Sequence, residues 1–127
     1  ISISRMIFNG FFEKYQGLKI IVSHVGGTLP YIVGRLDACY KFMAPCRENI
    51  NQKPSEYLRM MYYDSLGFTP DAIRLCLEVG GSEHVMYGSD YPHLIGQMDL
   101  AKERVNKLPS KFHKSIFNKA ARTIFSL

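Results

Sequence analysis

Segments typical of strands alternate with segments typical of helices along this chain, and the alternation limits the folds open to it. Apolar residues recur at helical spacing and predict helices over residues 2–15, 29–42, 70–79, 98–105, 109–117 and 118–125. Short runs rich in β-branched and aromatic residues predict strands over residues 18–22, 59–65 and 84–88. Strands joined by helices pair in parallel through right-handed crossovers. The order therefore predicts an α/β fold with parallel strands and helices outside.

Two of the predicted strands are each followed by a titratable side chain. His24 follows the strand over residues 18–22, and Asp90 lies in the turn after the strand over residues 84–88. The carboxyl ends of parallel strands meet at one edge, where open α/β sheets and barrels keep their active sites. Asp90 taken alone is compatible with capping a turn as well as with catalysis, and a single histidine is more often structural. Two strand ends of the same construction favour a catalytic site that contains both.

Four motifs carry a resemblance to a known family. They cover residues 24–30 (HVGGTLP), 34–35 (GR), 87–93 (YGSDYPH) and 118–125 (NKAARTIF). In this order and at this spacing they resemble the C-terminal part of the metal-dependent amidohydrolases related to 2-amino-3-carboxymuconate 6-semialdehyde decarboxylase. The resemblance covers essentially all 127 residues.

The resemblance implies that the three predicted strands are the sixth, seventh and eighth of a TIM (β/α)8 barrel. A complete barrel needs about 250 residues. We therefore expect residues 1–127 to form a single domain of about three βα units, a C-terminal fragment of a barrel that begins at Ile1 rather than at a methionine. Its two open sheet edges should favour pairing with other chains, aggregation, or dependence on further sequence.

The resemblance also implies one divalent metal, with zinc expected, at the C-terminal rim of the barrel. Asp90 matches the family's aspartate ligand, which also takes part in proton transfer, and His24 matches the histidine that activates the metal-bound water. A carboxylate is a suitable zinc ligand, and histidine exchanges a proton near neutral pH. The family's remaining ligands come from a His-x-His on the first strand and a histidine after the fifth, and neither region is in this chain. We expect the isolated chain to bind zinc weakly and to be inactive.

Arg35 matches an arginine that, in the decarboxylase branch, reaches into the neighbouring subunit and holds a substrate carboxylate. Its guanidinium suits bidentate pairing with such a group. The alternative is an ion pair with Asp37 or another acid on the same rim. The substrate-binding interpretation implies a homodimer. Asp64, at the end of the middle strand, is expected to cap the turn before Gly67, although hydrogen bonding to a ligand stays open.

Composition excludes several classes of partner. The net charge is +5, but the basic residues are spread along helices instead of forming a concentrated patch, which argues against nucleic-acid binding. The three cysteines show no CxxC spacing, which argues against a disulfide framework or a thiolate zinc site. No apolar run approaches membrane-spanning length and no signal peptide is recognised, so a cytoplasmic location without membrane contact is expected.

These observations lead to two hypotheses about function. In the first, the chain is part of a metal-dependent hydrolase or non-oxidative decarboxylase that acts on a small cyclic or aromatic carboxylic acid. In the second, it is a catalytically inactive fragment or interaction module that lacks the N-terminal metal ligands and pairs its open edges with another chain.

Overall fold

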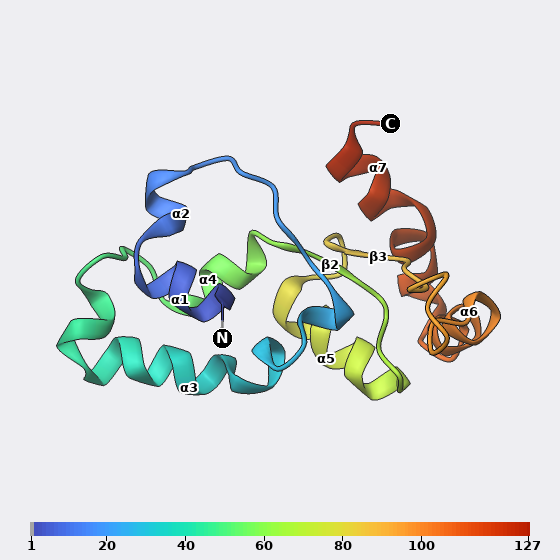
Figure 1. Cartoon of the computed structure of the whole chain (residues 1–127), viewed down its shortest axis with the longest axis horizontal. Coiled ribbons are helices and arrows are strands. Elements are labelled where there is room, and N and C mark those ends of the chain that lie inside the picture. Colours follow the sequence, from blue (N-terminus) through green and yellow to red (C-terminus); the bar gives the residue numbers. More distant parts are fainter. Residues whose placement is uncertain (1) are drawn as a thin grey trace.

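A computed structural model describes residues 2–127 and contains a three-stranded parallel sheet (Figure 1). The strands are β1 (Ile21–Val22), β2 (Tyr62–Asp64) and β3 (Val85–Met86), in the spatial order β1-β2-β3. Ile21 pairs with Tyr62, and Tyr63 pairs with Val85. Each strand is separated from the next by helices, as the sequence predicts, so β2 is central and the carboxyl ends of all three strands lie at one edge.

The helices account for most of the remaining chain. They are α1 (Ser2–Phe8), α2 (Phe11–Lys14), α3 (Leu29–Phe42), α4 (Pro54–Arg59), α5 (Pro70–Gly80), α6 (Met98–Asn106) and α7 (Ala120–Phe125). Shorter helical turns are η1 (His24–Gly26), η2 (Ala44–Arg47), η3 (Ser110–Phe112) and the π-helical η4 (Ser115–Lys119). Figure 1 shows α3 and α5 on one side of the strands and α7 on the other. Among the described residues, no helix is both long and apolar enough to cross a bilayer.

The predicted helix over residues 2–15 is wrong as a single element, because the chain breaks between α1 and α2. Gly10 has φ +72°, and a Cβ there would lie 2.5 Å from the carbonyl oxygen of Asn49. Only glycine fits this left-handed position against a neighbouring backbone. The close approach allows the N-terminal segment to turn back over the loop that precedes α4.

The strands are shorter than predicted, most clearly in the segment over residues 59–65. Arg59 ends α4, and the amides of Met60 and Met61 donate to the carbonyl oxygens of Tyr57 and Leu58. Because these donors are used within a local turn, the strand ladder begins only at Tyr62. A run of large apolar residues does not distinguish the end of a buried helix from a buried strand.

Tyr63 on β2 lies at the centre of the core. Its ring is fully buried, and its hydroxyl donates to the Leu58 carbonyl oxygen over 2.7 Å. Burial raises the pKa of Tyr63. A Cβ at Gly80 would lie 2.5 Å from the Tyr63 ring and one at Gly26 would lie 3.0 Å from it, so two glycines let α5 and the turn after β1 pack against the ring. Cys76, in an apolar helical segment, is also fully buried, and burial raises its pKa to about 12.

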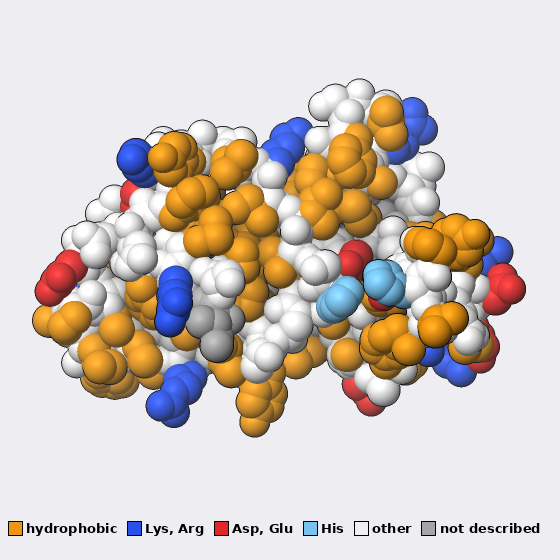
Figure 2. Space-filling view, viewed as in Figure 1, with side chains coloured by type: hydrophobic (Ala, Val, Ile, Leu, Met, Phe, Trp, Pro, Cys, Tyr) orange, Lys and Arg blue, Asp and Glu red, His pale blue; other side chains and the backbone are white. Residues whose placement is uncertain are grey.

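The opposite face of the sheet carries a smaller apolar cluster. Tyr62 and Met86 point away from Tyr63, as alternation along a strand requires, and pack with Ala120 and Ile124 of the last helix. Apolar side chains remain exposed along edge strand β1, where Ile21 is 43% exposed. Figure 2 shows apolar side chains gathered over a broad part of the visible surface. The sheet is thus covered incompletely within residues 2–127, as the partial-barrel prediction requires.

Candidate active site at the carboxyl ends of the strands

The turn after β1 holds His24 in an unusual backbone conformation. His24 has φ +56° and Val25 has φ +50°, so two consecutive residues with side chains occupy the left-handed region. Such conformations are costly for residues with a Cβ and persist when surrounding contacts impose them. Here the backbone amides of His24 and Val25 donate to the two carboxylate oxygens of Asp64, over 2.8 and 3.1 Å.

Asp64 ends β2 and binds backbone only. Besides the two amides across the strand gap, its Oδ1 accepts the amide of Leu66 over 2.9 Å. The expectation that Asp64 caps its own turn is confirmed, and the contact to the neighbouring strand end is an addition that sequence reasoning missed. The signal available in the sequence was the position of Asp64, an acid at the end of a buried strand as Asp90 is.

The turn after β3 presents Asp90. The Gly88 amide donates to the buried Ser65 hydroxyl over 3.3 Å, and Asp90 has φ +59°. The loop then folds back: the His93 amide donates to the Asp90 carbonyl oxygen over 2.9 Å. A Cβ at buried Gly96 would collide with that same carbonyl group. Asp90 is therefore held by a compact loop rather than by a strand ladder.

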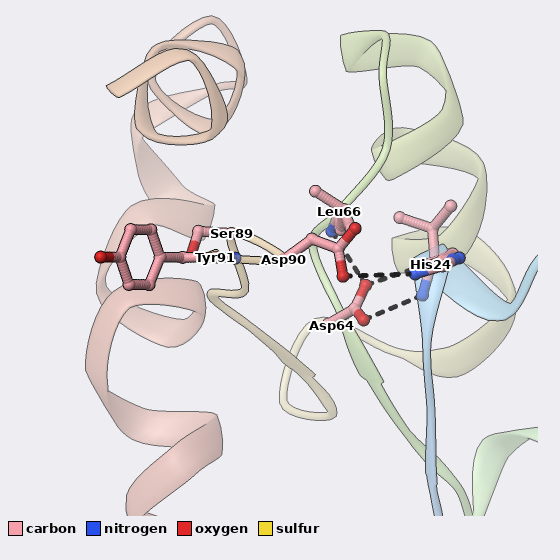
Figure 3. Close-up of polar contacts among 7 residues, drawn as sticks. His24, Asp64, Leu66, Ser89, Asp90 and Tyr91 are labelled. Atoms are coloured by element: carbon pink, nitrogen blue, oxygen red, sulfur yellow. Dashed lines mark hydrogen bonds and ion pairs between the residues drawn. The ribbon is translucent and has the colours of Figure 1, made fainter. Parts of the chain in front are cut away.

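These three turns bring together the two residues predicted to be catalytic. His24 Nε2 lies 3.8 Å from Asp90 Oδ1, and the two side chains are 59% and 22% exposed. Figure 3 shows Asp64 and Asp90 directed toward the His24 turn, with Tyr91 pointing away. An exposed imidazole beside a partly buried carboxylate can pass a proton to a small molecule or share a cation with the carboxylate.

His24 and Asp90 fit part of a metal site. Imidazole nitrogen and carboxylate oxygen are donors that divalent transition metals accept. Within residues 2–127, no group of three or more His, Cys, Asp or Glu side chains is placed to hold a metal ion. The two side chains therefore supply a partial donor set, and the Asp64 carboxylate is already occupied by backbone amides.

Arg35 lies on the exposed side of α3. Asp37, its predicted alternative partner, instead accepts the Ser55 amide over 2.9 Å. Among residues 2–127, Arg35 makes no ion pair within 4.0 Å with Asp37 or with another acid. The guanidinium is free for an external partner.

Other predicted details near the rim differ. The sequence makes Thr28 a plausible cap for the helix over residues 29–42, but Thr28 does not cap α3, because its backbone is already helical and its side chain makes no capping bond. His84 packs on the Tyr62 ring with centroids 4.7 Å apart, away from the carboxyl edge, as expected. His113 lies in a basic segment, which predicts a surface position, but the structure places it half-buried, with Nε2 2.9 Å from the Leu108 carbonyl oxygen. His24 is thus the histidine that the turn after β1 brings to Asp90.

The sequence matches the family described as "Amidohydrolase" over residues 1–127. The chain belongs to the amidohydrolase family. It is 29% identical over 99 residues to the 2-amino-3-carboxymuconate-6-semialdehyde decarboxylase of Dictyostelium discoideum, covering 77% of this chain and 28% of that protein. It is 32% identical over 89 residues to the 6-methylsalicylic acid decarboxylase of Penicillium expansum, covering 69% and 28%. The predicted resemblance is confirmed.

Solved structures confirm the fold. The 5-carboxyvanillate decarboxylase of Novosphingobium aromaticivorans, in complex with manganese and 4-hydroxy-3-methoxy-5-nitrobenzoic acid, is 28% identical and superimposes with a TM-score of 0.83. The alignment covers 98% of this chain and 38% of that enzyme. The three βα units of this amidohydrolase chain are part of a TIM (β/α)8 barrel, and the chain spans about a third of the length of such relatives.

Proposed function

We propose that this chain forms one domain, the catalytic-rim portion of a metal-dependent carboxy-lyase that removes CO2 from a small aromatic or cyclic carboxylic acid. The observation that carries the proposal is the His24–Asp90 pair, 3.8 Å apart at the carboxyl ends of barrel strands. That edge is where TIM-barrel enzymes hold their reacting groups. Decarboxylase names among the relatives favour loss of CO2 over hydrolysis of an amide or lactone.

Asp90 would contribute to holding one divalent metal, with the His24 imidazole beside it. The bound metal would supply Lewis-acid stabilisation of negative charge on a substrate oxygen. Zinc is the expectation from the resemblance, whereas a solved relative contains manganese. A nitrogen and a carboxylate oxygen suit both ions, so we propose a divalent metal and leave the choice to a direct comparison.

His24 is proposed to exchange the proton that decarboxylation needs. A proton adds to the ring carbon that bears the carboxylate, the bond to the carboxylate carbon then breaks, and its electron pair restores the ring as CO2 leaves. The exposed imidazole can reach a substrate at the rim, and the Asp90 carboxylate stabilises the protonated imidazole. Asp90 thereby combines ligation with control of proton transfer.

Arg35 is proposed to bind a substrate carboxylate in the neighbouring subunit of a homodimer. Support comes from its exposed position without an ion pair and from the apolar residues beside it on α3, where Tyr31 is 81% and Phe42 is 74% exposed. Mixing subunits that carry His24→Asn with subunits that carry Arg35→Ala tests this sharing of sites. Activity should reappear in the mixture because half of the sites in the mixed dimer are intact.

The test of the proposed reaction is CO2 release by the protein expressed from its complete reading frame. The acids to try are the aromatic 6-methylsalicylate and 5-carboxyvanillate, together with the open-chain 2-amino-3-carboxymuconate 6-semialdehyde, each with manganese or zinc. Turnover that disappears in His24→Asn and Asp90→Asn supports the proposal. Turnover that survives both substitutions, or that is absent for all three acids with both metals, contradicts it.

The second candidate is an inactive interaction module. It is favoured by the absence, within residues 2–127, of a third ligand beside His24 and Asp90, and by the exposed apolar surface of β1. Sizing the 127-residue chain separates the candidates in part. A monodisperse monomer contradicts an edge-pairing module, whereas a defined complex that binds no metal favours it.

A further inference from the structure

Asp64 connects the turns that carry the two proposed catalytic residues. Its carboxylate accepts the amides of His24 and Val25 from the turn after β1. Its Cβ lies close to Gly88 on the segment leading to Asp90, where an added Cβ would be 2.9 Å away. The side chain on the central strand therefore contacts both neighbouring strand ends (Figure 3).

The bonds to Asp64 divide unequally between its oxygens. Within the described residues, Oδ2 accepts a single amide, that of His24, over 2.8 Å. Oδ1 accepts the amides of Val25 and Leu66, over 3.1 and 2.9 Å. Anionic acceptors make the strongest bonds to backbone amides, and this one faces the two residues held at positive φ.

We propose that Asp64 is a positioning residue, which imposes the left-handed turn at His24 and so fixes the imidazole relative to Asp90. The inference rests on the proposed function of the His24–Asp90 pair. Without the Oδ2 bond, the His24 backbone relaxes toward a negative φ, and its side chain leaves the direction of Asp90. Asp64 acts through this turn, because its two oxygens accept the three backbone amides.

Asp64→Asn tests the link with little change in volume. A carboxamide has one acceptor oxygen, and placing it at the Oδ1 position keeps the bonds from Val25 and Leu66 while an NH2 group faces the His24 amide. The expected result is amide hydrogen exchange at His24 that is about 10- to 100-fold faster, with Val25 and Leu66 little changed. Residue-resolved exchange measured by NMR provides this readout without any turnover.

Activity provides the second readout. Asp64→Asn should lower kcat about 10- to 100-fold with KM little changed, as for other residues that orient a catalytic side chain. In a His24→Asn background the same substitution should change kcat less than about 2-fold, because its effect passes through His24. A merely structural role would give similar losses in both backgrounds.

Asp37→Asn is the matched control. Asp37 is also half-buried and also binds a backbone amide through its carboxylate, that of Ser55, but it lies on α3 away from the three turns. The Asp37→Asn variant should leave kcat and the amide hydrogen exchange of His24 unchanged. Gly88→Ala is a second variant, whose methyl group presses on Asp64 from the other strand and should also lower kcat.

The outcomes separate the inference from the proposed function. A wild-type protein without turnover contradicts the proposed function and, with it, the catalytic part of the inference. Amide hydrogen exchange then still tests whether Asp64 holds the His24 turn. Turnover in the wild type with unchanged kcat and exchange in Asp64→Asn overturns the inference alone. If Asp64→Asn does not fold, the wild type and Gly88→Ala provide the test. Fast exchange of the His24 and Val25 amides in the wild type overturns the inference. Slow exchange in the wild type together with a reduced kcat in Gly88→Ala supports the inference.

Discussion

Asp64 and Glu13 both bind backbone amides of other elements through a carboxylate, and they hold very different regions. Asp64 binds the turn at His24, where two consecutive residues are at positive φ and the His24 side chain is exposed. Glu13 of α2 accepts the Asn51 amide over 3.1 Å and the hydroxyl of buried Tyr57, in the region that precedes β2. A carboxylate that accepts backbone amides thus holds a strained turn at the rim in one place and joins α2 to the loop before α4 in the other.

The hydrogen bonds of Asp64 and those of Glu13 differ in what they do for the backbone. At Asp64 the bonds hold His24 and Val25 in a left-handed backbone conformation, against the preference of residues with a Cβ for negative φ. Backbone strain of this kind is typical of functional sites. At Glu13 they satisfy amides of a loop between helices, and the Tyr57 hydroxyl also accepts the Asn51 and Gln52 amides over 3.2 Å each. Loss of the first should appear in activity and loss of the second in stability.

The largest expected effect is on activity at the rim. His24→Asn should lower kcat about 10²- to 10⁴-fold, because asparagine tolerates positive φ but cannot exchange a proton at neutral pH. Its melting temperature should change little, since the side chain is 59% exposed. Steady-state kinetics and calorimetry measure the two quantities, and a large loss of stability would contradict the contrast between the regions.

Tyr57→Phe should show the converse behaviour. It removes the donor to Glu13 and the acceptor for two amides, so the free energy of unfolding should fall by about 1–3 kcal/mol. kcat should be unchanged, because the group lies before β2 and not at the rim. Urea denaturation provides the measurement. Tyr31→Phe is the control, since that side chain is 81% exposed and its loss should be almost neutral.

The pH dependence of stability should sharpen the comparison further. The pKa of Glu13 lies below its ordinary value of 4.5, chiefly because the Tyr57 hydroxyl donates to it and then because of the Asn51 amide. A carboxyl group with a lower pKa in the folded chain stabilises the fold above its unfolded pKa, and the stabilisation is lost as the pH falls through the folded value.

The difference in unfolding free energy between wild type and Glu13→Gln should therefore be full at neutral pH and decline below about pH 4.5. Denaturation series at several pH values test this expectation. A difference that persists unchanged into strong acid would show that the hydrogen bonds of Glu13 do not depend on its charge.

The smallest effect is expected at a cap on the rim side that is not part of the site. Thr69 Oγ1 accepts the Ala72 amide over 3.2 Å at the start of α5, where a threonine followed by Pro70 is a local start signal for a helix. Thr69→Ala should cost about 1 kcal/mol in unfolding free energy. It should leave kcat unchanged although Thr69 follows Asp64 closely in sequence. A fall in kcat similar to that of Asp64→Asn would mean that the rim responds to any loss of local stability.

Local patterns predicted several elements well. The bounds of α3 agree with the prediction over 29–42, since helical spacing continues until residues that cannot extend it, and the Thr69-Pro70 start of α5 is a local signal. The break at Gly10 and the late start of β2 were missed because each depends on a contact with distant backbone or on a turn that competes with the ladder. Short apolar runs leave such choices open.

The sequence by itself determined the alternation of elements, the family motifs and the identity of His24 and Asp90 as candidates, because spacing and residue type are local properties. Only the tertiary structure decided that their side chains approach to 3.8 Å and that Asp64 binds the turn that carries His24. Parallel pairing of β1 with β2 and of β2 with β3 brings three separate turns to one edge. The contacts between these turns arise from strand pairing, which joins segments far apart in the sequence and therefore cannot be predicted from any one of them.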